Sequence, residues 1–207
     1  SNPTNTPIDR HDIARCGDPL FLSWYPMRVT YSRELSIKQY LDDLNIENFI
    51  PMRYGMVPNE NGKMRRKLIP AVNNLIFIHS TRQILTNLKM TRREFLPLRY
   101  MISRPHDSER GTVMVVPDDQ MSNFIRVASI QDERVIFPEQ ATFLGKEGHQ
   151  VRVTDGDFKG VTGVIKRVKG SKRVVVELKD IAAVAIAFIP GAFLQIIDNG
   201  EKNLQKK

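Results

Sequence analysis

The chain has 207 residues, a length that suits one large domain or two small ones. Hydrophobic residues make up 41% of it and charged residues 26%, close to the globular average, which excludes a wholly disordered or low-complexity chain. The longest apolar run, Ile181 to Ile189, is much shorter than the roughly 20 residues of a membrane helix, so we expect no membrane partner. Cys16 is the only cysteine and no secretory signal is visible, which predicts a cytoplasmic protein without intrachain disulfides.

Positive charge is concentrated in one part of the chain. Lys and Arg total 31 against 23 Asp and Glu, a net charge of +8, and within residues 61–99 the only acidic residue is Glu94. We expect this segment to meet nucleic acid or an acidic protein surface, although a solvated basic face would have the same composition. Its basic residues are Lys63, Arg65, Arg66, Lys67, Arg82, Lys89, Arg92, Arg93 and Arg99.

The first elements follow a polar tail. Residues 1–19 contain prolines and polar residues without periodicity, which predicts a disordered segment. Phe21 to Tyr31 is rich in aromatic and β-branched residues and predicts a buried strand, with a bulge or strand end at Pro26. Ser32 is then expected to cap a helix that carries Glu34 in its first turn and apolar residues at helical spacing behind it.

The elements that follow complete an α+β domain, which we place at residues 20–131. Their order of strand, helix, two strands, helix, strands, helix is typical of a ferredoxin-like sandwich, in which helices cover one face of a small sheet. The last helix should be capped by Asp118. The segments in between are an extended stretch at Asn48 to Val57, a turn at Pro58 to Gly62, strands at Asn74 to His79, Leu98 to Ile102 and Thr112 to Val116, and a short helix around Ile84 to Leu88.

The carboxy-terminal part has a different pattern. Residues 132–147 have mixed charges and no clear period, which predicts a linker, although the apolar Val135 to Phe137 could form one strand. From residue 148 to 198, short β-rich runs separated by turn residues predict a small closed barrel, with a two-residue hairpin turn at Gly170-Ser171. Residues 199–207 form a carboxy-terminal tail.

The sequence offers no catalytic constellation. The four histidines are scattered without metal-ligand spacing, and Cys16 lies in the predicted tail. The pairs Asp118-Asp119 and Asp155-Asp157 suit a helix start and a turn, where Asp is favoured for local reasons. The glycines near Gly156 lie between strands and not between a strand and a helix, as a phosphate-cradling loop requires. We therefore expect no enzymatic activity, no metal and no cofactor.

Residues 148–178, GHQVRVTDGDFKGVTGVIKRVKGSKRVVVEL, resemble the KOW motif of NusG-type transcription elongation factors and of some ribosomal proteins. The spacing is physically reasonable for a barrel. It predicts a strand, a turn at a glycine, an aromatic residue that fills the interior, and a glycine where two parts of the chain cross closely. The resemblance implies an SH3-like barrel in contact with RNA, the ribosome or the transcription machinery. The matching positions are Val151, Val153, Gly156, Phe158, Gly160, Gly163 and Val164.

The amino-terminal part resembles the NusG amino-terminal (NGN) domain, in which a strand opening with Trp24-Tyr25 is followed by a helix and by a strand like Asn74 to Ile78. The segments LIPAVNNLIFIHST and VVPDDQMSNFIRV are most similar to the UpxY branch of specialised NusG paralogues. This resemblance implies a monomeric antitermination factor for surface (capsular) polysaccharide operons, similar in role to RfaH. In RfaH the barrel can refold as a helical hairpin, but here the β-branched run Val174 to Val176 favours strands, so we expect no such switch.

The resemblance also implies a set of contacts with RNA polymerase. Family NGN domains lay an apolar surface on the clamp helices of the polymerase and so disfavour pausing and termination. The corresponding residues here are Trp24, Tyr25, Val72, Leu75 and Phe77, although strand aromatics are as often core residues. The family's aromatic-Pro-Gly turn is replaced by Val72-Asn73-Asn74, where Asn tolerates the left-handed backbone that would preserve the turn.

Nucleic-acid contacts are expected from two segments. The loop before the first helix matches the place where specialised paralogues touch the displaced DNA strand, so Tyr31 could stack on a base of non-template DNA or leader RNA, and Arg33 could pair with a phosphate. The basic run of Lys63, Arg65, Arg66 and Lys67 could follow DNA near the polymerase, or could be a solvated flexible loop.

The sequence is also compatible with two other functions. Relatives use the KOW barrel to bind a ribosomal protein or a termination factor, and KOW barrels also occur in ribosome-associated and general RNA-binding proteins. The NGN-like half favours the transcription factor over such a protein. A housekeeping NusG that acts on most genes is the third possibility.

Overall fold

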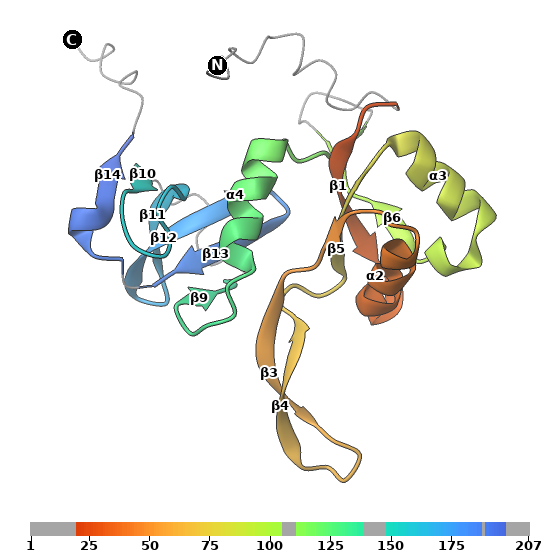
Figure 1. Ribbon diagram of the computed structural model, residues 1–207, viewed down its shortest axis with the longest axis horizontal. Coiled ribbons are helices and arrows are strands. Elements are labelled where there is room, and N and C mark those ends of the chain that lie inside the picture. The colour runs from red at the N-terminus through yellow and green to blue at the C-terminus, as the bar shows by residue number, and fades with distance from the viewer. Residues whose placement is uncertain (1–19, 105–110, 139–147, 188, 198–207) are drawn as a thin grey trace, which may run out of the picture. The chain divides into compact units, whose positions relative to one another are not determined.

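The computed structural model describes residues 20–104, 111–138, 148–187 and 189–197. The predicted tails at 1–19 and 199–207 and residues 139–147 of the predicted linker lie outside the described residues. By contacts between residues, the chain forms two compact units (Figure 1). The first comprises Ser1–Ile50 and Asn73–Asp118, and the second Pro51–Val72 and Asp119–Lys207.

A four-stranded antiparallel sheet forms the centre of the first unit. Its order is β2-β5-β1-β6, and β1 therefore lies between β5 and β6. The core that this sheet builds includes Tyr25, Met27 and Phe77, all almost fully buried. The four strands are β1 (Ser23–Val29), β2 (Asn48–Phe49), β5 (Leu75–Ser80) and β6 (Leu98–Tyr100), and a separate pair joins β7 (Ile102–Ser103) to β8 (Thr112–Val113).

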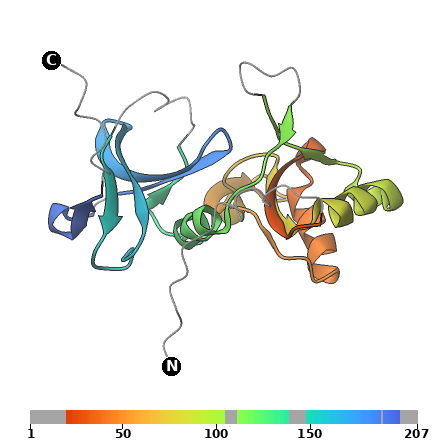
Figure 2. The ribbon, with the colours of Figure 1, turned by 90° about the horizontal axis from the view of Figure 1, so that it is seen from above.

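Two helices lie on one side of this sheet, α2 (Glu34–Asp43) and α3 (Arg82–Thr91) (Figures 1 and 2). Helix α2 buries Ile37 and Leu41, two of the residues that predicted it by their helical spacing. Helix α3 buries Leu85 and is capped by Thr81, whose hydroxyl accepts a hydrogen bond from the backbone N–H of Ile84 at 3.2 Å. The predicted α+β fold is confirmed, but the chain forms four strands and not two between α2 and α3.

The strand β1 runs through Pro26 without the predicted bulge or end. The N–H of Val29 donates to the carbonyl of Asn74, just before β5, so by alternation the missing N–H of Pro26 would point to the other side, toward β6. On that side β6 pairs only with Met27–Val29, and Trp24 forms an isolated bridge to Val116. Pro26 therefore sits in the gap between two pairings, where a missing donor costs no ladder hydrogen bond.

The second unit contains a β-ribbon made of β3 (Met52–Pro58) and β4 (Met64–Pro70). Among the described residues these strands pair only with each other, in a two-stranded sheet. The segment Lys63 to Lys67, predicted only as a basic run, lies largely in β4. A ribbon with both faces largely exposed needs no alternation of apolar and polar residues, so periodicity could not reveal β4.

The barrel part of the second unit is an antiparallel sheet with the order β14-β10-β11-β12-β13-β9. Helix α4 (Asp118–Ala128) precedes it in the chain and buries Met121 and Phe124. Because α4 begins at Asp118, this residue stands in the first turn. The strands are β9 (Val135–Ile136), β10 (Gln150–Val153), β11 (Thr162–Val168), β12 (Ser171–Leu178), β13 (Ala182–Ile186) and β14 (Leu194–Ile196).

Two details of the barrel refine the predictions. The hairpin turn consists of Lys169 and Gly170, one residue earlier than predicted, and their φ angles of 49° and 82° are both positive, as a two-residue hairpin of type I′ requires. The strand considered at Val135 to Phe137 is present as β9 and pairs with β13. This stretch of the predicted linker is therefore part of the barrel's sheet.

Candidate nucleic-acid interface

The loop between β1 and α2 displays an aromatic side chain. Tyr31 is 85% exposed, and both Tyr31 and Ser32 have positive φ angles, of 63° and 51°. Two consecutive non-glycine residues in the left-handed region are strained, and such strain is common where a loop is shaped for function. Arg33 follows directly, is exposed, and stands at the amino-terminal end of α2.

A network of hydrogen bonds from Asn74, which precedes β5, and from α2 holds this loop. The buried carboxylate of Glu34 accepts a hydrogen bond from the backbone N–H of Asn74, and the side chain of Asn74 accepts one from the N–H of Ser32 at 3.2 Å. Asn74 has a φ of 59°, so the left-handed backbone expected in the Val72-Asn73-Asn74 turn is confirmed at this residue. The prediction that Ser32 caps α2 is wrong, because Arg33 occupies the N-cap position and makes no side-chain cap.

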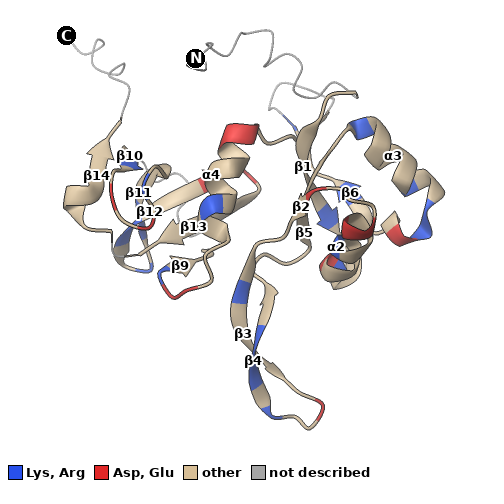
Figure 3. Cartoon of the chain, viewed as in Figure 1, with Lys and Arg blue, Asp and Glu red and all other residues tan. Residues whose placement is uncertain are grey.

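The predicted basic run lies along the β3–β4 ribbon (Figure 3). The side chains of Lys63, Arg65, Arg66 and Lys67 are all exposed. The antiparallel register pairs Met56 with Arg66 and Val57 with Arg65, so successive basic residues of β4 alternate between the two faces of the ribbon. Phosphates could therefore approach either face.

The predicted polymerase surface divides between two faces of the main sheet. The pairs Trp24–His79, Pro26–Phe77 and Arg28–Leu75 face each other across β1 and β5, which places Trp24, Phe77 and Leu75 on one face. Tyr25 lies on the opposite face, where its ring meets Tyr100 edge to face at 6.1 Å. The Tyr100 hydroxyl in turn donates to the backbone carbonyl of Arg82, at the start of α3.

Four of the five predicted polymerase-contact residues are buried as core residues, the alternative weighed for strand aromatics, and their contact with the polymerase stays a prediction. Leu75 and Phe77 have no exposed area, and Trp24 and Tyr25 have 5% and 1%. Val72 is half-buried and is the one of the five that retains accessible area. The physical reason is that each of the four lies in β1 or β5, the two central strands of the sheet, whose side chains form the core.

The ring of Trp24 packs against the ring of His79. The rings of Trp24 and His79 stack with centroids 4.7 Å apart and planes 8° apart. The Nδ1 atom of His79 lies 2.6 Å from a carboxylate oxygen of Glu47, and its Nε2 atom lies 3.8 Å from one of Asp118. The histidine thus connects the aromatic core to two carboxylates at the rim of the unit.

The seven KOW positions form the scaffold of the barrel. Val151, Val153 and Phe158 are buried, whereas Val164 is half-buried. Gly156 and Gly160 have φ angles of 78° and 88°, which only glycine adopts freely. A Cβ atom on Gly163 would lie 2.7 Å from the carbonyl oxygen of Val175, so a side chain there would collide with the backbone of β12.

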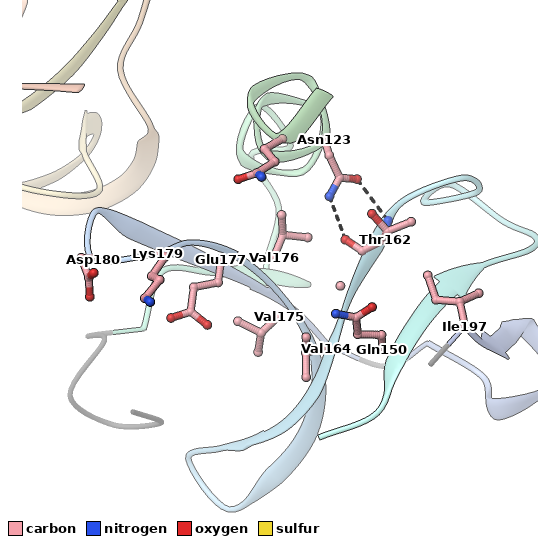
Figure 4. A pocket seen from close by; sticks show the side chains of 12 residues that line it. Asn123, Gln150, Thr162, Val164, Val175, Val176, Glu177, Lys179, Asp180 and Ile197 are labelled. Atoms are coloured by element: carbon pink, nitrogen blue, oxygen red, sulfur yellow. Dashed lines mark hydrogen bonds between the residues drawn. The ribbon is translucent and has the colours of Figure 1, made fainter. Parts of the chain in front are cut away.

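A cleft within the second unit lies between α4 and the barrel (Figure 4). Its volume is about 630 Å³, and its lining mixes amide, charged and valine side chains from α4, β10, β11 and β12. At its edge the side-chain amide of Asn123 donates to the carbonyl of Thr162 at 2.7 Å and accepts from its N–H at 3.1 Å. The Asn123 side chain thus donates and accepts one bond each, as a neighbouring strand would. The two bonds attach α4 to the start of β11.

The carboxy-terminal end of α4 continues into an ion-pair cluster on the barrel. Arg134 pairs with Asp132 at 2.6 Å and with Asp157 at 2.8 Å, and its guanidinium carbon lies 5.3 Å from the ring centroid of Phe158. Hydrogen bonds from Arg134 hold the pKa of Asp132 below its usual value and raise the pKa of Arg134 itself. These contacts join the segment after α4 to the glycine turn of the KOW motif.

Tyr54, the aromatic residue of the ribbon, was not predicted from the sequence as a functional residue. The guanidinium carbon of Arg66 lies 4.2 Å from the ring centroid of Tyr54, an exposed residue of β3. The exposed tyrosine beside a basic run was the available signal, but its stacking on Arg66 depends on the register of the ribbon.

Two further features, a metal-ligand cluster and a membrane-spanning helix, are absent from the described residues. Within residues 20–104, 111–138, 148–187 and 189–197, no group of three or more His, Cys, Asp and Glu side chains is placed to hold a metal ion. In the same part of the chain, no helix is both long enough and apolar enough to cross a bilayer.

Comparisons with known proteins identify the family. The model of the family described as transcription termination factor NusG matches residues 22–125, and the KOW motif model matches residues 147–177. A solved structure described as "Domain interaction in Thermotoga maritima NusG" is similar with a TM-score of 0.43 and 16% identity, over 87% of this chain and 99% of that chain. No curated protein matches the sequence. Because the first model spans half of the chain and the second covers all seven KOW positions, the chain belongs to the NusG family of transcription factors.

Proposed function

We propose that this protein is a specialised NusG paralogue that binds RNA polymerase through its NGN domain and suppresses pausing or termination. The observation that carries the proposal is the pair of family matches, since NusG-family proteins are non-enzymatic transcription factors that generally bind RNA polymerase. We infer that it acts as a monomer in the cytoplasm. Its KOW barrel would contact a second partner, a ribosomal protein or a termination factor.

The proposed polymerase surface is the face of the sheet that carries Trp24, Leu75 and Phe77. Because these three side chains are buried, they shape the surface and do not touch the clamp helices directly. The direct contacts fall to half-buried residues at its margin. Val72 lies in the connection between β4 and β5, and Phe49 pairs with Phe77 on the same face, with ring centroids 6.5 Å apart.

The proposed nucleic-acid contacts are Tyr31 and Arg33 in the loop and the basic side chains of the ribbon. The support for Tyr31 is its exposure together with the network through Glu34 and Asn74, which holds the loop in one strained shape. A preformed loop loses little conformational entropy when it binds. The polynucleotide would be non-template DNA or the nascent leader RNA.

Retention of purified RNA polymerase tests the central proposal. Val72→Asp places a charge on the proposed surface at a half-buried site and should lower retention at least about fivefold, because the new carboxylate would be unpaired in the contact with the clamp helices. Met90→Asp makes a similar change on α3, where the side chain is 81% exposed, and should leave retention unchanged. Absence of retention by the wild type would remove the proposal. Ribosomal co-sedimentation that survives high salt would instead favour a ribosome-associated KOW protein.

The specialisation rests on the similarity of LIPAVNNLIFIHST and VVPDDQMSNFIRV to UpxY proteins. We propose that the protein serves surface (capsular) polysaccharide operons. Mapping its occupancy along the chromosome should give signal over a few long operons of this kind. Similar occupancy over most transcribed genes would indicate a housekeeping NusG.

A further inference from the structure

The β3–β4 ribbon has two chemically different faces. The register pairs Tyr54 with Leu68, Met56 with Arg66 and Pro58 with Met64, so these residues share one face. The other face carries Arg53, Lys67 and Arg65 around Gly55 and Val57. We call the first the aromatic face and the second the basic face.

The aromatic face exposes planar and apolar groups to solvent. Tyr54 is 45% exposed, and Met56 and Met64 are each 58% exposed. Arg66 lies diagonally across the strands from Tyr54 and stacks on its ring at 4.2 Å. A guanidinium stacked on a tyrosine is a flat, positively charged platform, which is the kind of surface on which nucleobases stack.

Hydrogen bonds close the turn at the tip of the ribbon. The side-chain oxygen of Asn59 accepts hydrogen bonds from the N–H groups of Asn61 and Lys63, at 3.0 and 2.8 Å. The backbone of Asn59 bonds to Lys63, and Gly62 takes up a φ of 74° to close the turn. These bonds hold the backbone of the turn in one conformation, so less of it has to be ordered on binding.

Charge on the ribbon favours an anionic partner. Residues 51–72 contain five basic residues and one acidic residue, Glu60. Within the part of the chain that the structure describes, none of the five cations forms an ion pair with a carboxylate. The five cations are Arg53, Lys63, Arg65, Arg66 and Lys67.

We propose that the ribbon is a binding site for single-stranded DNA, in which a base stacks on the Tyr54–Arg66 platform while phosphates contact the basic face. Duplex DNA would satisfy the charges but would hide the base faces that the platform needs. The side chains of Met56, Met64 and Pro58 offer no hydrogen bond to a ribose 2′-hydroxyl, so these apolar groups give RNA no advantage over DNA. The inference rests on the proposed function only in that both use the basic side chains of the ribbon.

Fluorescence anisotropy with the full chain tests this site. The probes are a labelled single-stranded DNA, its duplex and the single-stranded RNA of the same sequence. We expect the single-stranded DNA to bind more tightly than its duplex and at least as tightly as the RNA. Tyr54→Ala should weaken its binding about 5- to 100-fold, the range that loss of a stacked base gives, while Tyr54→Phe should keep most of the affinity.

A matched pair of arginine variants separates stacking from charge. Arg66→Lys keeps the charge but removes the planar group, and should weaken binding severalfold. Arg65→Lys makes the same change on the basic face and should weaken binding less than Arg66→Lys does, because a lysine also pairs with a phosphate. This pair keeps the proposal testable if Tyr54→Ala does not fold, which circular dichroism would reveal.

The dependence of binding on salt gives a second readout. Arg53→Gln removes a phosphate contact and should lower the slope of log affinity against log salt by about 0.7, whereas Tyr54→Phe should leave the slope unchanged. Equal binding of the duplex, tighter binding of the RNA, or equal effects of Arg65→Lys and Arg66→Lys would overturn the proposal. Polymerase retention is measured separately, so failure of this site and failure of the proposed function are distinguishable.

Discussion

Single residues in unusual backbone conformations shape the proposed nucleic-acid interface. Tyr31, Ser32 and Asn74 all have left-handed backbones, although none of them is glycine. Each such residue costs on the order of 1 kcal/mol, which the buried Glu34–Asn74 hydrogen bond and the surrounding strands sustain. The result is a loop whose aromatic side chain points into solvent and does not join the core.

Replacement of Tyr31 should separate binding from stability. Tyr31→Gly relieves the left-handed strain but makes the unfolded chain more flexible, so the free energy of unfolding should change by less than about 1 kcal/mol. Affinity for single-stranded nucleic acid should fall, because the stacking side chain is lost. Ser32→Gly is the control, since it changes the neighbouring left-handed residue and leaves Tyr31 in place. Equal affinities of the two variants would contradict the assigned role of Tyr31.

The raised pKa of Tyr25 predicts that the fold loses stability at alkaline pH. Burial raises the pKa of its hydroxyl, and the nearby Tyr100 adds to the shift. In the unfolded chain this group ionises near its ordinary pKa of 10.0, whereas in the folded protein it keeps its proton to higher pH. Its contribution to stability is therefore complete below about pH 10 and is lost as the pH rises through the raised pKa.

Urea unfolding between pH 8 and pH 11 measures this effect. The wild type should lose more stability above about pH 10 than Tyr25→Phe, which cannot ionise at this position. The comparison cancels the titration of the other tyrosines and lysines. Parallel pH profiles for the two proteins would show that Tyr25 has the same pKa in the folded and unfolded chains.

Among the elements, the strands of the KOW barrel require a glycine where two of them pass close to each other. Gly163 lies in β11 where the backbone of β12 passes close by, so Gly163→Ala would bring its Cβ atom against the carbonyl of Val175. We expect a loss of about 1–3 kcal/mol from this overpacking. Gly191→Ala should be nearly neutral, because a Cβ atom there would meet nothing within 4 Å. Thermal unfolding of both variants measures the difference, and similar midpoints would contradict the close approach at Gly163.

At the scale of the whole molecule, we expect the two units to unfold in separate transitions, so a destabilising substitution in one unit should lower only the transition of that unit. Phe77→Ala removes a fully buried ring from the first unit and should cost about 3–5 kcal/mol. Gly163→Ala acts on the second unit. In calorimetry of the full chain, we expect each variant to lower a different unfolding transition. A single transition lowered by both variants would show that the units unfold together.

The sequence alone predicted those features that depend on local chemistry. Helical spacing of apolar residues found α2, α3 and α4, and alternation of β-branched residues with glycine turns found the barrel. The family resemblance drawn from Trp24-Tyr25 and from the KOW positions was confirmed as NusG. These signals are local because helix and strand periodicity, and the backbone freedom of glycine, are properties of short segments.

Tertiary structure decided which residues face each other, because that depends on partners far apart in the chain. Register across β1 and β5 put Trp24 and Tyr25 on opposite faces of one sheet and buried both. The left-handed loop at Tyr31 depends on Asn74, which lies more than forty residues away, and the platform of Tyr54 and Arg66 depends on the pairing of β3 with β4. No local propensity encodes such pairings, since they form only when the whole sheet or ribbon assembles.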